Sequence, residues 1–442
     1  MTSAGCAIGL GNVWRFPFIT GQYGGAAFVL FYLVFLVALG LPIMVMEFTV
    51  GRASGKSAAK SFHALEPLGS KWHIHGYIAT IGNYVLMMFY TTVAGWMFAY
   101  IAKSARGVFT GLGAEQIGGV FNQMLQNPAE MVGWMALVII VGFIICLRGL
   151  EKGVEKASTA IMTSLLCLMI VLVVRAVTLD GALKGISFYL KPDFSKMSEH
   201  GWGEVIFAAM GQSFFTLSIG IGSLAIFGSY IGKERALTGE AVSIIALDTF
   251  VALMAGFIIF PTCFAFGVNP GQGPGLIFIT LPNIFNAMKF SRVWGTIFFA
   301  FMSFAALSTV IAIFEDLIAS VMDLFGWSRK KAVIINLVAV FVLSLPCALG
   351  FNVLSGVQFA AIGNIQDLED FIVSNNLLPL GSLVYLMFCT SRYGWGFKNF
   401  IAEANTGNGM KFPVQIRFYI TWILPLIVLA IWLVGYAQKF FS

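Results

Sequence analysis

Apolar residues occur along the whole chain in stretches long enough to cross a lipid bilayer. A helix needs about 20 residues to span a hydrocarbon core of about 30 Å. The length of the stretches predicts helices, because strands of a membrane β-barrel are about ten residues long and alternate apolar with polar positions. The pattern predicts eleven spans, at residues 1–22, 26–50, 76–102, 131–147, 157–174, 205–230, 241–266, 293–323, 332–350, 371–391 and 418–438.

The composition agrees with a chain that lies mostly in lipid. Of the 442 residues, 59% are apolar and 10% are charged, whereas an ordinary soluble domain has about 25% charged residues. We therefore expect an all-α, multi-pass protein of the cell inner (plasma) membrane, with the lipid bilayer as its surroundings. The net charge of +6 follows from the basic residues of the loops and does not indicate a nucleic-acid partner.

Basic residues in the loops predict the orientation, because cytoplasmic loops carry an excess of Lys and Arg. One set of alternate loops carries fifteen Lys and Arg residues and the opposite set carries seven. The N-terminus is therefore predicted to be cytoplasmic. The richer set consists of Arg52, Lys56, Lys60, Lys71, Arg148, Lys152, Lys156, Lys233, Arg235, Arg329, Lys330, Lys331, Arg392, Lys398 and Lys411.

Glycine and small polar residues interrupt two of the spans, the first and the sixth. Each has a Gly-x-Gly pair, Gly9 with Gly11 and Gly220 with Gly222. The two spans lie five apart, which is typical of a transporter built from two inverted five-helix repeats. Close helix packing is the alternative, since Gly5 and Gly9 also have small-xxx-small spacing. The predicted units are 1–178 (first repeat), 179–202 (extracellular connection), 203–392 (second repeat) and 393–442 (loop and helix 11).

An interrupted helix at mid-membrane depth leaves peptide groups without partners. Each unpaired group in hydrocarbon costs several kcal/mol, so a bound ligand is expected there. Free N–H groups at a half-helix N-terminus suit a carboxylate, and free carbonyl groups suit a sodium ion.

Ionisable residues inside spans are functional candidates by default. Asp248 has apolar neighbours on both sides, so either a cation pairs with it or it is neutral and bonds a neighbouring backbone. Glu47 ends the second span. It either has a functional role or lies at the cytoplasmic surface of the membrane. Arg15 and Asp370 begin the outer halves of their spans and could face each other, although Arg15 could instead extend toward the membrane surface. The full set is Arg15, Glu47, Asp248, Glu315, Asp316 and Asp370.

The eighth span contains two adjacent hydroxyl groups, Ser308 and Thr309, close to Ala305. Such hydroxyl groups usually bond to a carbonyl one turn earlier. Oxygen ligands without thiolate or imidazole also suit a hard cation.

Cysteine and histidine do not form a catalytic or metal-binding motif in the sequence. The cysteines have no metal-ligand spacing and are expected to be buried thiols. No histidine lies within a predicted span, which disfavours an intramembrane hydrolase. An enzyme is therefore not expected. The cysteines are Cys6, Cys146, Cys167, Cys263, Cys347 and Cys389.

Several motifs resemble the neurotransmitter:sodium symporter family, in the bacterial amino-acid branch that includes the bacterial leucine transporter. They extend over nearly the whole chain and are highly specific as a set. They are GLGNVWRFPF from Gly9, YGGAAF from Tyr23, MEFTVGR from Met46, YTTVAGW from Tyr90, GQSFFTLSIGIGS from Gly211, LDTFVALMAGFIIFP from Leu247 and DLEDF from Asp367.

The resemblance implies an amino-acid site with two sodium ions. It places Ala7, Asn12, Thr216 and Asp248 at the first sodium, and Gly5, Ile8, Ala305, Ser308 and Thr309 at the second. The substrate is expected at Cys6, Ala7, Leu10, Gly11, Leu86, Tyr90, Phe215, Thr216, Ser218, Ile221, Thr309 and Ile313. The resemblance also implies an outer gate of Arg15 and Asp370, a lid of Phe215 and Tyr90, and a structural role for Glu47 beneath the sixth span.

Three departures from the family pattern refine this expectation. Gly9 stands where monoamine carriers have an aspartate, which favours an α-amino acid over an amine. Tyr32, Gln212 and Thr216 match chloride-site positions, but Ala252 replaces the serine of chloride-dependent members. Asp248 could supply the missing negative charge, so chloride independence is expected.

The third departure concerns the first span. Its cytoplasmic end and the basic or Trp gate residue of the family are expected to be missing, and Asp323 matches the usual partner of that residue. The expected function is sodium-coupled import of a neutral, hydrophobic amino acid by alternating access. A truncated or non-transporting amino-acid binding or sensor protein is the alternative.

Overall fold

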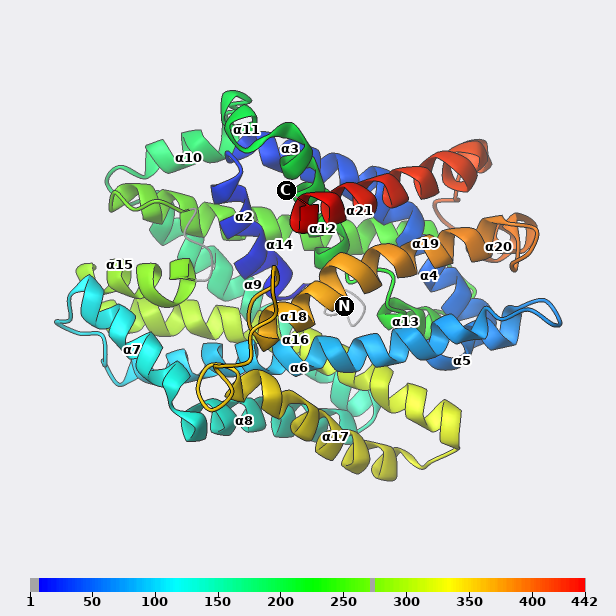
Figure 1. Ribbon diagram of the computed structural model, residues 1–442, viewed down its shortest axis with the longest axis horizontal. Helices are drawn as coiled ribbons and strands as arrows, with labels where there is room; N and C mark the ends of the chain where they lie inside the picture. Colours follow the sequence, from blue (N-terminus) through cyan, green and yellow to red (C-terminus); the bar gives the residue numbers. More distant parts are fainter. Residues whose placement is uncertain (1–7, 271–274, 442) are drawn as a thin grey trace.

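The computed structural model describes residues 8–270 and 275–441, which form a helical molecule (Figure 1). Within these ranges, nine helical segments are long and apolar enough to cross a membrane. The all-α membrane fold that was predicted from the sequence is therefore confirmed. The nine segments are Ala26–Ser54, His73–Ala105, Pro128–Leu147, Lys152–Val177, Leu237–Ala265, Ser291–Phe325, Arg329–Leu349, Ile365–Thr390 and Val414–Ala437.

The two remaining predicted spans are the ones predicted to be interrupted. The sixth is divided into α12 (Trp202–Leu217) and α13 (Ser223–Tyr230). Between the two helices the backbone has positive φ at Ser218 (52°), Gly220 (97°) and Gly222 (76°). Glycine adopts this region readily because it has no Cβ, so the Gly220–Gly222 pair explains where this helix stops.

The described part of the first span begins at Ile8. Ile8 and Gly9 are not helical, and a π-helical turn η1 (Gly11–Arg15) leads into α2 (Phe16–Gln22). The predicted site residues Gly5, Cys6 and Ala7 lie outside the described residues, as does the predicted loss of the cytoplasmic end.

Proline accounts for a recurrent irregularity in the helices. Five π-helical turns are each followed by a helix with proline at its second position. Proline lacks the N–H that would bond to the carbonyl four residues earlier, and a π-bulge is one way to accommodate that loss. The turns η1, η2 (Leu36–Gly40), η4 (Leu276–Thr280), η5 (Val373–Leu377) and η7 (Tyr419–Ile423) precede Pro17, Pro42, Pro282, Pro379 and Pro425.

Two long helices, α6 (His73–Ala105) and α16 (Ser291–Phe325), pack together at the centre of the molecule (Figure 1). The most apolar part of α16 is 83% buried, whereas that of the last span, which ends in α21 (Leu424–Phe441), is 22% buried. The central pair therefore forms the scaffold, and α21 lies at the periphery. The other helices are α3 (Ala26–Phe35), α4 (Leu41–Ser54), α5 (Ala58–Leu65), α7 (Ala114–Gln126), α8 (Pro128–Leu147), α9 (Lys156–Val177), α10 (Ala182–Leu190), α11 (Ser195–His200), α14 (Leu237–Ala265), α15 (Leu281–Ala287), α17 (Arg329–Leu349), α18 (Ile365–Ile372), α19 (Leu378–Thr390) and α20 (Phe397–Ala404).

Two sequence expectations were wrong. The third span begins at His73 rather than at residue 76, so His73 and His75 lie within its helix. Cys167 on α9 is exposed, whereas Cys146, Cys263, Cys347 and Cys389 are buried. A thiol behaves as a small hydrophobe, and the outer surface of a membrane protein accepts such a group as readily as its interior does. Cys6 lies outside the described residues.

Candidate functional site

A narrow cavity lies where the first and sixth spans meet α6 and α16. Hydroxyl groups and peptide groups supply its polarity, because its lining contains no charged side chain among the described residues. The predicted residues Leu86, Tyr90 and Ile221 are in this lining. The complete lining is Gly9, Gly11, Leu86, Tyr90, Phe215, Thr216, Ser218, Ile221, Thr309, Val373 and Leu378.

Glycine is required at two positions of the cavity wall. A Cβ atom on Gly9 would lie 2.2 Å from Thr309 Oγ1 and 2.5 Å from Tyr90 Oη. A Cβ atom on Gly11 would lie 3.0 Å from the Phe215 ring. The wall is therefore formed by bare backbone that closely approaches three other helices.

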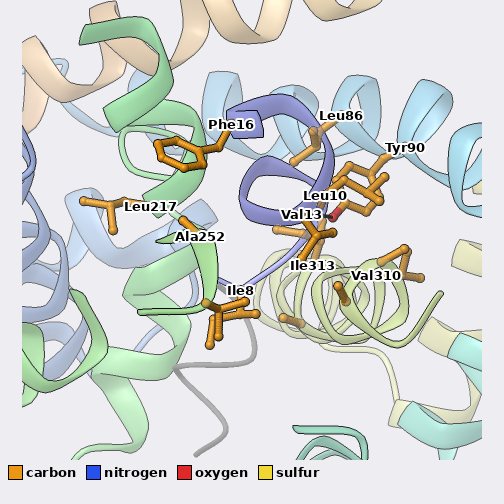
Figure 2. Close-up of a cluster of buried hydrophobic side chains, with 14 of the residues drawn as sticks. Ile8, Leu10, Val13, Phe16, Leu86, Tyr90, Leu217, Ala252, Val310 and Ile313 are labelled. Carbon is orange, nitrogen blue, oxygen red and sulfur yellow. Dashed lines mark hydrogen bonds between the residues drawn. The ribbon is translucent and has the colours of Figure 1, made fainter. Parts of the chain in front are cut away.

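Tyr90 connects α6 to the interrupted first segment. Its hydroxyl accepts a hydrogen bond of 2.9 Å from the N–H of Leu10. Figure 2 shows Leu86 and Tyr90 of α6 beside Leu10. The hydroxyl thus lies at the edge of the cavity, next to the first peptide N–H of the helical part of this span.

Three polar side chains, those of Asp248, Asn12 and Thr216, form a first cluster beside the cavity. Asp248 on α14 is fully buried. Its Oδ1 accepts a hydrogen bond of 2.7 Å from Asn12 Nδ2, and its Oδ2 accepts one of 3.2 Å from Thr216 Oγ1. Among the described residues no basic side chain forms an ion pair with Asp248. Asp248 and Thr216 supply oxygen atoms of the kind that suit a hard cation, whereas Asn12 turns its amide N–H₂ group toward the carboxylate.

A second cluster of oxygen atoms lies where α16 meets Ile8. Ser308 Oγ donates hydrogen bonds to the carbonyl oxygens of Ile8 (2.7 Å) and Ala305 (2.8 Å). Thr309 Oγ1 donates a longer bond, 3.4 Å, to the Ile8 carbonyl. Four oxygen atoms from two segments almost 300 residues apart thus converge. Ser308 thus makes the usual bond to a carbonyl one turn earlier, and its role as a cation ligand stays a prediction.

Arg15 and Asp370 lie together on the other side of the Phe215 ring. Arg15 Nη1 is 3.8 Å from Asp370 Oδ1. Ser374 joins them, since it accepts a bond of 3.0 Å from Arg15 and donates one of 2.6 Å to Asp370. The Arg15 guanidinium lies 4.3 Å from the centroid of the Phe215 ring. A basic, an acidic and an aromatic residue from three segments therefore cover this end of the cavity.

The gap between α12 and α13 is held by side chains from α4 and α6. Glu47 accepts hydrogen bonds from the N–H groups of Gly220 (2.9 Å) and Leu224 (3.0 Å). Asn83 donates to the Ile221 carbonyl (3.2 Å) and to Asp316 Oδ2 (2.7 Å). Asn83 was not identified from the sequence, although a lone amide in an apolar span is a usable signal.

Three other candidates have partners that the sequence did not reveal. Asp323 accepts hydrogen bonds from the Ser57 N–H (2.8 Å) and hydroxyl (2.7 Å) and lies 3.7 Å from Lys56 Nζ. Glu315 is paired with Arg329, with an Nη1 to Oε1 distance of 3.0 Å. Gln212 donates to the Gly11 carbonyl (2.8 Å).

Among the described residues, two predicted substrate contacts do not line the cavity: Leu10, whose backbone N–H bonds to Tyr90, and Ile313. Ile313 is fully buried on α16 and packs within the core, whereas Val373 and Leu378 form part of the lining. Tyr32 and Ala252, from the expected chloride set, are also fully buried.

Comparison with known proteins defines the class of protein. The sequence matches the sodium:neurotransmitter symporter family over residues 1–111 and 115–440. The chain belongs to this family, a family of membrane transporters and not of enzymes.

Individual relatives support the same assignment. The sodium-dependent transporter YhdH of Bacillus subtilis is 33% identical over 98% of this chain and 95% of its own length. A sodium-dependent transporter of Haemophilus influenzae is 32% identical, with the same coverage of both chains. The crystal structure of MhsT in complex with L-phenylalanine superposes with a TM-score of 0.88 at 37% identity and covers 98% of this chain and 97% of that one. The chain is thus a multi-pass member of a sodium-dependent transporter family.

Proposed function

We propose that this protein is a sodium-coupled symporter that imports a neutral, hydrophobic α-amino acid by alternating access. The observation that carries the proposal is the buried Asp248 carboxylate, hydrogen-bonded by Asn12 and Thr216 beside an uncharged cavity. A buried carboxylate without a basic partner is costly, and a bound sodium ion would neutralise it.

Two sodium sites follow from the two oxygen clusters. The first consists of the Ala7 carbonyl, Asn12, Thr216 and Asp248. The second consists of the carbonyls of Gly5, Ile8 and Ala305 with the Ser308 and Thr309 hydroxyls. The convergence of Ile8, Ala305, Ser308 and Thr309 supports the second site.

The substrate site is the cavity itself. The N–H groups around Leu10 and Gly11, with the Tyr90 hydroxyl, would hold the substrate carboxylate. Gly9 leaves no side-chain carboxylate in the cavity wall, so the substrate brings its own. The apolar lining of Leu86, Ile221, Val373 and Leu378 favours a hydrophobic side chain. The relative MhsT was solved with L-phenylalanine, which supports the same substrate class.

Coupling arises because the substrate carboxylate completes the shell of the first sodium ion. Each ligand then raises the affinity for the other by the same factor. Inward movement of one sodium ion through 100 mV releases about 2.3 kcal/mol before any concentration gradient is counted. This free energy drives accumulation of the amino acid.

Alternating access would use the two inverted repeats, 1–178 and 203–392, within an eleven-helix arrangement whose N-terminus is cytoplasmic. The pairing of Arg15 with Asp370 and the position of Phe215 support a gate that is closed on the outer side. The Glu47 hydrogen bonds hold the interrupted sixth span while the gate moves.

Uptake of labelled phenylalanine into proteoliposomes tests the proposal. Accumulation that requires an inward sodium gradient is expected. Saturable binding without accumulation would instead favour an amino-acid sensor, and the absence of both would overturn the proposal.

A further inference from the structure

Two histidines and a glutamate gather at the connection between α5 and α6, outside the substrate cavity. His63 lies on α5, Glu66 follows that helix, and His73 begins α6. Glu66 Oε1 is 3.1 Å from His63 Nδ1 and 2.7 Å from His73 Nδ1. The three ligand atoms all lie within 4.8 Å of one another.

The carboxylate is fixed by its other oxygen atom. Glu66 Oε2 accepts hydrogen bonds from the Ser70 hydroxyl (2.9 Å) and from the His73 N–H (3.1 Å). Glu66 Oε1 is thereby directed at both imidazoles.

We propose that His63, Glu66 and His73 form a binding site for a divalent transition-metal ion of the zinc class. Two imidazole nitrogens and one carboxylate oxygen form a common ligand set for zinc, with water in the fourth position. In a tetrahedral site with ligand distances of about 2.0–2.1 Å, ligand atoms lie about 3.3 Å apart. The distance from Glu66 Oε1 to His63 Nδ1, 3.1 Å, is close to that separation, whereas the distance to His73 Nδ1, 2.7 Å, is a hydrogen-bond length that would increase when an ion binds.

The site is accessible from solvent, and neighbouring residues orient its carboxylate. The His63 side chain is 69% exposed and that of His73 is 31% exposed, whereas that of Glu66 is 8% exposed. An ion can therefore enter from solvent, and it meets a carboxylate that neighbouring residues already orient. Supporting contacts of this kind raise metal affinity.

A metal ion here would hold α5 in place beneath the interrupted sixth span. A Cβ atom on Gly222 would lie 2.5 Å from Ala58 Cβ, so α5 packs directly against that interruption. Phe62 of α5 packs on His75 and Tyr385, with ring centroids 4.9 and 5.0 Å apart. Figure 1 shows α5 beside α13 and α6. Because the ligands join α5 to the start of α6, an ion would oppose movement of α5 away from this position.

Cobalt binding to the purified full-length protein without an affinity tag tests the site. Co²⁺ in a tetrahedral site gives visible absorption bands, and Zn²⁺ should abolish them by competition. We expect one saturable site in the wild type, with affinity at least tenfold lower in His63→Gln and in His73→Gln. His200→Gln, at the end of α11, is the matched control and should bind as the wild type does.

Hydrogen exchange of the α5 amides provides the second readout. Zn²⁺ should slow exchange in the wild type and in His200→Gln but not in His63→Gln, whose exposed position makes it tolerant of the substitution. Cobalt spectra without a saturable band, or an affinity unchanged by the two histidine substitutions, would overturn the metal site. Binding without slower exchange would overturn the effect on α5.

Discussion

Asn12 and Asp248 join the interrupted first span to α14 through a hydrogen bond of 2.7 Å between Nδ2 and Oδ1 in a fully buried environment. The same Asn12 uses its Oδ1 to accept the Gly9 N–H at 3.0 Å. One side chain therefore orients both the backbone at the cavity and the carboxylate beside it. Ion binding at Asp248 is thereby coupled to the shape of the substrate site.

Asp248→Asn tests the role of this carboxylate. The amide keeps the shape of the side chain but removes its negative charge. We therefore expect the sodium concentration for half-maximal substrate binding to rise at least tenfold, which corresponds to a loss of about 1.4 kcal/mol in the free energy of sodium binding. The measurement is substrate binding as a function of sodium concentration. Asp180→Asn, at an exposed position between α9 and α10, should leave the curve unchanged. An unaltered curve in Asp248→Asn would remove Asp248 from the sodium site.

Gly9→Ala tests the close approach of the cavity wall. The new Cβ would meet Thr309 Oγ1 and Tyr90 Oη at 2.2 and 2.5 Å, and overpacking of this kind costs about 1–3 kcal/mol. We expect substrate affinity to fall at least tenfold in an equilibrium binding assay. Gly211→Ala on α12, where a Cβ meets nothing within 4 Å, is the control. Normal binding by Gly9→Ala would show that the substrate does not need this wall.

Glu47→Gln tests the support of the sixth span. The carboxylate accepts two N–H groups, whereas an amide can offer only one acceptor oxygen and turns an N–H₂ group toward the other donor. Leaving a buried donor unsatisfied costs about 1–3 kcal/mol. The thermal unfolding midpoint in detergent should fall relative to the wild type, while Glu115→Gln on α7, at an exposed position, should not change it. Equal midpoints for Glu47→Gln and the wild type would contradict this role.

Arg15 and Asp370 should slow escape of the substrate. The pair is partly exposed, with side-chain exposures of 20% and 39%, so its contribution is modest, up to about 1 kcal/mol. We expect up to about fivefold faster dissociation of bound amino acid from Asp370→Asn, measured by dilution of labelled substrate. Arg15→Lys should show a further effect through loss of the planar group over Phe215. Dissociation rates equal to that of the wild type in both variants would exclude a gating role.

Chloride independence is a further expectation for transport. Asp248 accepts a hydrogen bond from Thr216, one of the residues at the expected chloride positions, so its carboxylate would supply the negative charge in place of an added anion. Uptake should be unchanged when gluconate replaces chloride at constant sodium. A collapse of uptake in gluconate would show that Asp248 does not replace the anion.

Much of the fold could be predicted because each feature has a local cause in the sequence. The Gly220–Gly222 pair marks the break between α12 and α13, and apolar length predicts the unbroken spans. The five prolines that follow π-helical turns share the missing N–H, but Pro261 and Pro346 lie inside α14 and α17 without such a turn, so proline alone does not predict one.

The exact cavity lining could not be predicted in the same way. Ile313 lies in a stretch of α16, residues 305–318, that is buried on all sides, so no polar face shows which side of this helix meets the cavity. Only packing places Ile313 in the core and Val373 in the lining. The exposure of Cys167 likewise depends on which face of α9 is directed outward. The hydrogen bond between Ser57 and Asp323 depends on the position at which α5 packs.

The most direct measurement is the reciprocal affinity of sodium and amino acid for the purified protein. Phenylalanine binding should be saturable in sodium and lost when potassium replaces it. The amino acid should increase sodium affinity by the same factor by which sodium increases amino-acid affinity. Equal phenylalanine affinity in sodium and potassium would contradict the account, because the carboxylate of Asp248 would then have no coupled cation.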